Sequence, residues 1–199
     1  MGLLPGDRVL LLGDGDLELE TSLSVSIGGP VDRSADGHHV PESAYALVAL
    51  SREVTGDRQR RQALAEAAGR ALAPHGMLIA EFPSLLAPLA RPLLAYEGLG
   101  SISVTGRGGT TYGGARGSLR RAGFARLTSC ICLPSLADPR IVLPLDSSGA
   151  LSYHYQPPFF EETWRRRLLR GALRQAARAG VLRVLSPGYV LLASRGGAT

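Results

Sequence analysis

The 199-residue sequence contains no lysine and no asparagine, and all 22 of its basic residues are arginine. Without lysine, the chain can neither form a lysine Schiff base nor hold a phosphate group through a Walker-type lysine. Without asparagine, it has no acceptor for N-glycosylation. The bias is typical of a GC-rich coding sequence, so we attach no functional meaning to it.

Cysteines and long apolar runs are also scarce. Cys130 and Cys132 are the only cysteines, and their spacing on a predicted strand places both on one face. Such neighbours rarely form a disulfide, and two ligands do not make a zinc site, so we expect small core residues in a reducing cytoplasm and no metal. No apolar run approaches ~18 residues, and no charged leader precedes an apolar stretch, so we expect neither a membrane span nor a signal peptide.

Charge is distributed unevenly along the chain. Residues 1–60 hold five arginines and ten acidic residues, whereas residues 61–199 hold seventeen arginines and seven acidic residues. Many of the basic residues fall on one predicted helix, 159–179. Since no aromatic residues that could stack on bases lie between these arginines, we expect no nucleic-acid binding. The pattern favours a solvated helix that faces a protein partner.

Apolar patterning predicts alternating strands and helices in a single domain over 1–199, with a proline-marked excursion at 134–180. Residues 84–95 are apolar and interrupted by proline, which indicates a short helix or covering segment, and the glycine-rich stretch 106–117 is expected to be a mobile loop. The expected strands are Arg8–Leu12, Thr21–Ile27, Tyr45–Leu50, Met77–Phe82, 125–133, Val181–Leu185 and Gly188–Ala193, with a helix at 57–73.

Several segments in this order resemble a class I S-adenosylmethionine (SAM)-dependent methyltransferase domain. They are Pro5–Asp16 (first strand and glycine loop), Tyr45–Leu50 (fourth strand), Arg70–Glu81 (helix end, turn and fifth strand), Leu119–Phe124 (helix ending before the sixth strand) and Leu185–Ala193 (last, antiparallel strand). The resemblance implies an α/β, Rossmann-like, mostly parallel sheet with helices on both faces and an antiparallel last strand. It also implies SAM as the cofactor, held by Gly13, Asp14, Gly15 and Asp16.

The chain departs from the family in this cofactor-binding half. Leu17 stands where the family has a third glycine, and the predicted strand Thr21–Ile27 leaves no room for the helix that normally lines the cofactor. Gly28-Gly29-Pro30 occupies the place of the acidic residue that binds the ribose, with Asp32 as a candidate substitute. We therefore predict a degenerate, shortened cofactor half in which SAM binding is weakened or lost.

Three residues are candidates for catalysis because they are expected at the carboxyl edge of the sheet, where α/β sites form. They are His38, His39 and Glu81, the histidines as general bases and the glutamate as a functional carboxylate. Tyr112 is a candidate lid residue, and His154, in an alternating Tyr-His-Tyr segment, is expected on the surface of a strand.

Three functions follow from these expectations. The first is a non-methylating accessory or partner subunit in the tailoring of peptide or small-molecule natural products, docking as a heterodimer or homodimer through the helix 159–179 and the apolar segment 84–95. The second is an active SAM-dependent methyltransferase on a small molecule or peptide. The third is a repurposed cyclase or lyase of the same fold.

Overall fold

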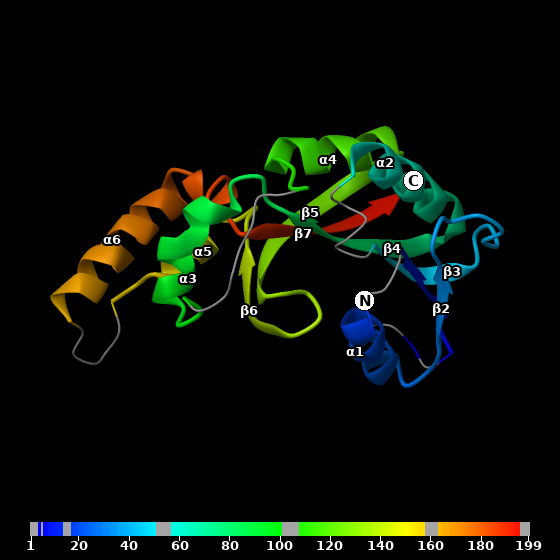
Figure 1. Cartoon of the computed structure of the whole chain (residues 1–199), viewed down its shortest axis with the longest axis horizontal. Helices are drawn as coiled ribbons and strands as arrows, with labels where there is room; N and C mark the ends of the chain where they lie inside the picture. Colours follow the sequence, from blue (N-terminus) through cyan, green and yellow to red (C-terminus); the bar gives the residue numbers. More distant parts are fainter. Residues whose placement is uncertain are drawn as a thin grey trace.

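The computed structural model describes residues 4, 6–13, 17–50, 57–100, 108–157 and 163–195, which form a seven-stranded sheet flanked by helices (Figure 1). The strands are β1 (Val9–Leu12), β2 (Val31–Ser34), β3 (Tyr45–Leu50), β4 (Leu72–Pro83), β5 (Phe124–Pro134), β6 (Pro139–Pro144) and β7 (Gly188–Arg195). The helices are α1 (Leu17–Ile27), α2 (Arg58–Ala71), α3 (Arg91–Tyr96), α4 (Tyr112–Arg121), α5 (Ser148–His154) and α6 (Trp164–Arg178), with short 3-10 turns η2 (Ala87–Ala90) and η3 (Val181–Arg183).

The strand order is β2-β1-β3-β4-β7-β5-β6. Strands β1 to β4 are parallel, whereas β7 runs antiparallel between β4 and β5, and β6 pairs antiparallel with the outer side of β5. The predicted mostly parallel sheet with an antiparallel last strand is therefore confirmed. The strand β6 and helices α5 and α6 lie within the excursion predicted at 134–180.

Helices cover the two faces of the sheet unequally. On one face, α2 and α4 pack with the main apolar core, in which Leu64 and Leu119 meet strand residues such as Leu12 and Phe82. On the other face, α1 contributes Leu19 to a much smaller apolar cluster. Figure 1 shows α2 and α4 above the sheet, α1 below it, and α3, α5 and α6 together beyond one end.

The strand predicted at Thr21–Ile27 is wrong, because these residues belong to α1. Their alternating pattern also places Leu19 and Leu23, four residues apart, on the sheet-facing side of a helix. The hydroxyls of Thr21 and Ser26 donate to carbonyl oxygens four residues earlier, which satisfies them within the helix. A parallel pair such as β1 and β2 needs a crossover connection, and this topological demand outweighs the local alternation.

The strand β2 lies where the sequence predicted no strand, and Val181–Leu185, expected to be a strand, begins with η3. Between β2 and β3 the chain runs along α2 instead of forming another helix and strand. The backbone N–H groups of Ser43 and Ala44 each donate at 2.9 Å to the carbonyl oxygens of Arg70 and Ala71, at the end of α2. The connection between β2 and β3 is therefore short and adds no helix or strand to the fold.

Two further expectations concern the second half of the chain. Residues 112–117 of the predicted mobile loop are helical and begin α4, which the hydroxyl of Thr111 caps by accepting from the N–H of Gly114. His154 lies at the end of α5, not on a strand. Among the described residues no helix is both long and apolar enough to cross a membrane.

Candidate functional site

The predicted cofactor loop follows β1. Gly13 has φ of 115°, a conformation that glycine adopts without strain, and its N–H donates at 2.9 Å to the carbonyl oxygen of Ser34 at the end of β2. This bond ties the carboxyl ends of β1 and β2 together. The other predicted cofactor residues, Asp14, Gly15 and Asp16, lie outside the described residues, and α1 begins directly after them at Leu17.

The helix expected to be missing from the cofactor half is thus present. Strand β1, Gly13 and helix α1 follow one another as strand, turn and helix, the order that brings the amino-terminal end of a helix to the carboxyl edge of a sheet. Free N–H groups at such a helix end favour anionic groups. The expectation that this helix is absent, which was one reason for predicting a degenerate cofactor half, is therefore wrong.

Asp32 does not lie at that edge. It is the second residue of β2 and pairs with Arg8 at 2.7 Å, while also accepting from the hydroxyl of Tyr45 at 3.0 Å. The hydrogen bond from Arg8 is the main cause of the lowered pKa of Asp32. Asp32 and Arg8 line a hollow of about 200 Å³ near the amino ends of β1 and β2. The ion pair of this carboxylate therefore faces the amino edge of the sheet and not the carboxyl edge.

An acidic residue that sequence reasoning missed comes directly after β2. Asp36 accepts a hydrogen bond at 2.9 Å from the N–H of His38, which lowers the pKa of its carboxyl and keeps it ionised at neutral pH. It follows Ser34, whose carbonyl is bonded to Gly13, by two residues. The signal was hidden because α1 was interpreted as the second strand, which shifted the expected position of the acid toward Asp32.

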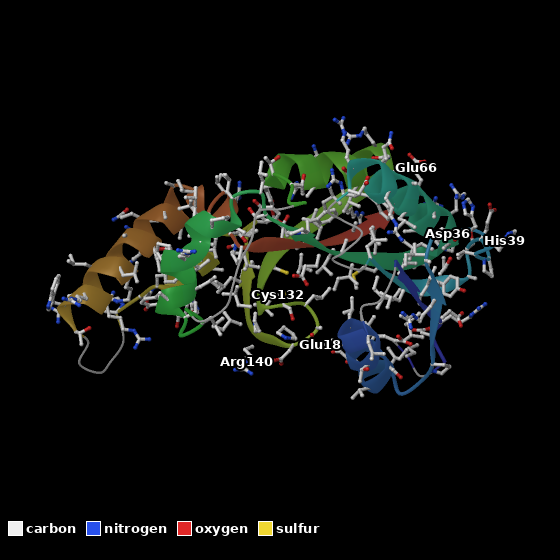
Figure 2. The ribbon with its side chains drawn as sticks, viewed as in Figure 1. Glu18, Asp36, His39, Glu66, Cys132 and Arg140 are labelled. Atoms are coloured by element: carbon white, nitrogen blue, oxygen red, sulfur yellow. The ribbon has the colours of Figure 1, made fainter. Side chains whose placement is uncertain are left out.

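His38 and His39 are exposed residues of the shortened connection. The preceding Gly37 is buried against α2, where an added Cβ would lie 2.6 Å from the Cβ of Ala67. This places the two histidines beside α2, and Figure 2 shows His39 at the outer end of the molecule, far from Cys132. The connection has turned away from the strand ends by this point.

Glu81 occupies a different setting. It is 8% exposed near the carboxyl end of β4, on the face that α1 covers. One carboxylate oxygen, Oε2, accepts from the N–H of Leu136 at 2.9 Å, in the turn between β5 and β6. The structure therefore does not bring Glu81 together with His38 and His39, which lie by α2 beyond the other face.

A polar cluster that the sequence did not reveal joins α4 to β5. The Nη1 of Arg116 donates to the hydroxyls of Tyr112 (3.0 Å) and Ser129 (2.8 Å) and pairs with Asp146 at 3.2 Å. Tyr112, the predicted lid residue, also packs edge-on against the ring of Tyr189. These contacts anchor Tyr112 at the start of α4.

The group of α3, α5 and α6 contains a second buried carboxylate. The side chain of Glu97 is 7% exposed and accepts from the hydroxyl of Tyr155 at 3.3 Å, while its Oε1 lies 2.9 Å from Nε2 of His154. Burial raises the pKa of Tyr155 well above its usual range. Because both partners of Glu97 come from α5 and its end, the cluster holds α5 against the end of α3.

No protein-family model and no curated protein sequence matches this chain. Solved structures do resemble it. A SAM-dependent methyltransferase from Archaeoglobus fulgidus superposes with a TM-score of 0.52 at 13% identity, over 96% of this chain and 88% of the other. One from Thermotoga maritima superposes with a TM-score of 0.50 at 15% identity, over 97% of this chain and 84% of the other.

At these identities the likeness concerns the fold. The chain has a class I SAM-dependent methyltransferase-like fold, as its motifs predicted. In the described part of the chain, no three or more His, Cys, Asp or Glu side chains gather in an arrangement that could hold a metal ion.

Proposed function

We propose that the chain binds SAM at the carboxyl edge of β1 and β2 and transfers its methyl group to a small molecule or peptide. The observation that carries the proposal is the unit of β1, Gly13 and α1, with Asp36 two residues after the end of β2, the strand that is bonded to Gly13. It supplies the three things that a SAM site of this fold uses: a glycine turn, a helix end and an ionised carboxylate.

The residues present fit the cofactor in this outline. The positive φ of Gly13 lets the backbone turn sharply at the strand end, where the chain can approach a ligand closely. Asp36 carries a negative charge at neutral pH and can accept hydrogen bonds from vicinal hydroxyls such as those of a ribose. When bound, SAM would supply a methyl group activated on a sulfonium.

Among the predicted catalytic residues, Glu81 is the best candidate for a catalytic role in methyl transfer. Its carboxylate is buried near the carboxyl end of β4 and held in place by Leu136. A buried carboxylate in such a position can accept a proton or orient an amine or hydroxyl of the acceptor. His38 and His39 remain candidates for contacts with a substrate that extends along α2.

Calorimetry with SAM and with S-adenosylhomocysteine tests the proposal. We expect both to bind the wild-type chain, and Asp36→Asn to weaken binding about 10-fold or more, since hydrogen bonds to a charged group contribute about 1.5–3 kcal/mol. Asp32→Asn is the matched control, because it removes a carboxylate from the same strand region at the opposite edge. It should bind as the wild type does.

Absence of binding at millimolar cofactor would overturn the methyltransferase proposal. Equal weakening by Asp36→Asn and Asp32→Asn would instead overturn the assignment of Asp36 to the site, since the effect would then follow from general loss of charge. Glu81→Gln should bind SAM normally and lose methyl transfer to any acceptor that the wild type methylates.

The second candidate is an accessory subunit in natural-product tailoring that docks through α6 without transferring methyl groups. Trp164 is 66% and Leu168 is 65% exposed, one helical turn apart, and the guanidinium of Arg165 lies 5.4 Å from the ring centre of Trp164. Exposed Trp and Arg side chains are enriched among residues that dominate binding at interfaces. Leu85 and Leu89, in and beside η2, are also more than half exposed.

Sedimentation over a wide concentration range tests whether the occupant of this surface is a second copy of the chain. A dimer in the wild type that dissociates in Trp164→Ala and in Leu168→Ala, but persists in Val25→Ala on α1, would support docking through α6. A wild-type monomer throughout the range that methylates an acceptor unaided would contradict the accessory role.

A further inference from the structure

Helix α6 packs on the rest of the chain through one side only. On its inner side, Leu173 and Ala177 are buried in the main apolar core, and Arg170 is buried beside them. On its outer side, Trp164 and Leu168 lie one helical turn apart, and both are largely exposed. Figure 1 shows α6 (orange) at one end of the molecule, with α3 and α5 between it and the sheet. The two large apolar side chains therefore face solvent in the isolated chain.

The outer side continues along the helix with small or uncharged residues. Gly171, Ala172 and Gln175 follow at helical spacing and are exposed, and an added Cβ at Gly171 would have no atom within 4 Å. We call this set the outer stripe; its members are Trp164, Leu168, Gly171, Ala172 and Gln175. The stripe is open along its length, and its large apolar groups are concentrated at the start of the helix.

Positive charge flanks the outer stripe. The 15-residue helix contains six arginines and no acidic residue. Arg165 and Arg167 are exposed, and they lie on opposite sides of the stripe because successive residues are ~100° apart around a helix. Arg166 instead turns inward, and its Nη2 donates to the carbonyl oxygen of Tyr96 at 3.4 Å. An occupant of the outer stripe must therefore accept apolar side chains in the middle and carry negative charge on either side of them.

The surface of an anionic lipid bilayer has both properties. Tryptophan and leucine side chains insert at the boundary between headgroups and acyl chains, and neighbouring arginines contact the anionic headgroups. Because a membrane-spanning helix needs ~20 apolar residues, α6 would lie along the surface instead of crossing it. A protein surface of mixed charge would also present basic side chains, and α6 has no acidic residue to pair with them. The charge pattern therefore favours the bilayer over a protein partner.

We propose that α6 binds the surface of an anionic lipid bilayer, with Trp164 and Leu168 inserted among the headgroups and Arg165 and Arg167 in contact with lipid phosphates. The two kinds of contact act together, since a weak apolar anchor alone gives marginal binding and a basic patch supplies the second contribution. The inference goes beyond the proposed methyl transfer and does not depend on it. The SAM site that we propose lies at the carboxyl edge of β1 and β2, so the two kinds of binding can be measured separately.

Trp164 is the only tryptophan of the chain, so its fluorescence reports directly on the proposed contact. The full chain is titrated with vesicles of equal parts phosphatidylcholine and phosphatidylglycerol, and with vesicles of phosphatidylcholine alone. We expect the emission to shift to shorter wavelength with the anionic vesicles and to stay unchanged with the neutral ones. Lipids brominated on their acyl chains should quench the emission, and added salt should weaken binding because it screens the headgroup charge.

Co-sedimentation with the anionic vesicles measures the contribution of single residues. Arg165→Gln and Arg167→Gln should each weaken binding about fivefold, the value typical of one basic residue near an anionic surface. Leu168→Ala should weaken it about 10-fold or more, since most of an inserted apolar side chain is lost. The matched controls are Val25→Ala on α1 and Arg126→Gln on β5, which change exposed residues elsewhere and should bind as the wild type does.

Three results would overturn the proposal. The first is an emission that anionic vesicles leave unchanged or that neutral vesicles shift equally. The second is a shift that needs no vesicles and grows with protein concentration, which would mean that a second copy of the chain covers the outer stripe. The third is equal weakening in the controls and in the α6 variants. Fluorescence and quenching are measured on the wild type, so they decide the question even if a variant fails to fold. A chain that binds SAM but no vesicles would refute this inference alone, and one that binds vesicles but no SAM would refute only the proposed methyl transfer.

Discussion

Replacing Gly37 with alanine probes the shortened connection between β2 and β3. Gly37 has φ of +72°, and an added Cβ would lie 2.6 Å from the Cβ of Ala67 and 3.3 Å from a methyl carbon of Leu64. The left-handed conformation costs an alanine about 1–2 kcal/mol, and overpacking of a buried site costs about 1–3 kcal/mol. We therefore expect Gly37→Ala to lower the free energy of unfolding by about 2–5 kcal/mol in urea denaturation.

Gly98→Ala separates the two contributions. Gly98 has nearly the same φ, +76°, but no atom lies within 4 Å of an added Cβ. It should therefore lose only the conformational part, about 1–2 kcal/mol. Both substitutions reduce the entropy of the unfolded chain in the same way, so the difference between them measures the contact of Gly37 with α2.

A rescue variant completes the test. Ala67→Gly removes the atom that an alanine at position 37 would strike, so the combined variant should be less destabilised than the sum of the two single changes. Equal losses in Gly37→Ala and Gly98→Ala would refute the reasoning. They would mean that the connection does not pack on α2, and the account of how the fold is shortened would fail with it.

Three further predictions concern charged and phenolic groups. Arg116→Ala should lower the free energy of unfolding by about 1–3 kcal/mol in urea, because its donor bonds to a partly buried cluster are lost. The pKa of Tyr155 is raised in the folded chain, so its contribution to the free energy of unfolding is complete below the unfolded pKa of ~10 and is lost as the pH rises above that value. Tyr155→Phe should therefore flatten the alkaline decline of the melting temperature. Asp32 has a lowered pKa, so its pair with Arg8 stabilises above ~3.9 and weakens as the pH falls below that; Asp32→Asn should reduce acid sensitivity in the same assay.

The parts of the fold that the sequence predicted are those where local pattern and tertiary role agree. Continuous apolar runs gave β1 and β3, which are buried on both faces, and Asp57 caps α2 where the predicted helix begins. The helix end expected within Leu119–Phe124 is confirmed, since α4 ends at Arg121 and Gly123, with φ of +90°, follows its cap. In each case the local sequence pattern and the position in the folded chain favour the same structure.

Predictions failed where topology overrode pattern. Residues 21–27 alternate as a strand would, yet the crossover from β1 to β2 requires a helix there. The polar strand β2, with the sequence Val-Asp-Arg-Ser, has one strand neighbour and carries no apolar signal. The strand expected at 21–27 was one reason for predicting a degenerate cofactor half, and it directed attention to Asp32 and not to Asp36, the acidic residue that follows β2.

The candidate site residues also separate into those that the sequence could place and those that it could not. Gly13 and Glu81 could be placed from sequence because each adjoins a strand with a clear apolar run. His38 and His39 could not, because their position depends on how the connection after β2 folds onto α2, which Gly37 decides through space that no local pattern records. The Arg116 cluster was hidden for a similar reason: its members come from α4, β5 and the residues after β6.

The shortening also affects how the face that α1 covers is filled. The connection after β2 is packed on α2, so it adds nothing to the face that α1 covers. On that face the small cluster around Leu19 is completed by the turn between β5 and β6, through Leu136 and Ala137. Farther along the same face lie Glu81, Cys130 and Cys132, and among the described residues α1 is the only helix that contributes to the cluster around Leu19. A methyl acceptor for the proposed transfer would therefore approach Glu81 from the face that α1 covers, and not from the face on which α2 and α4 pack.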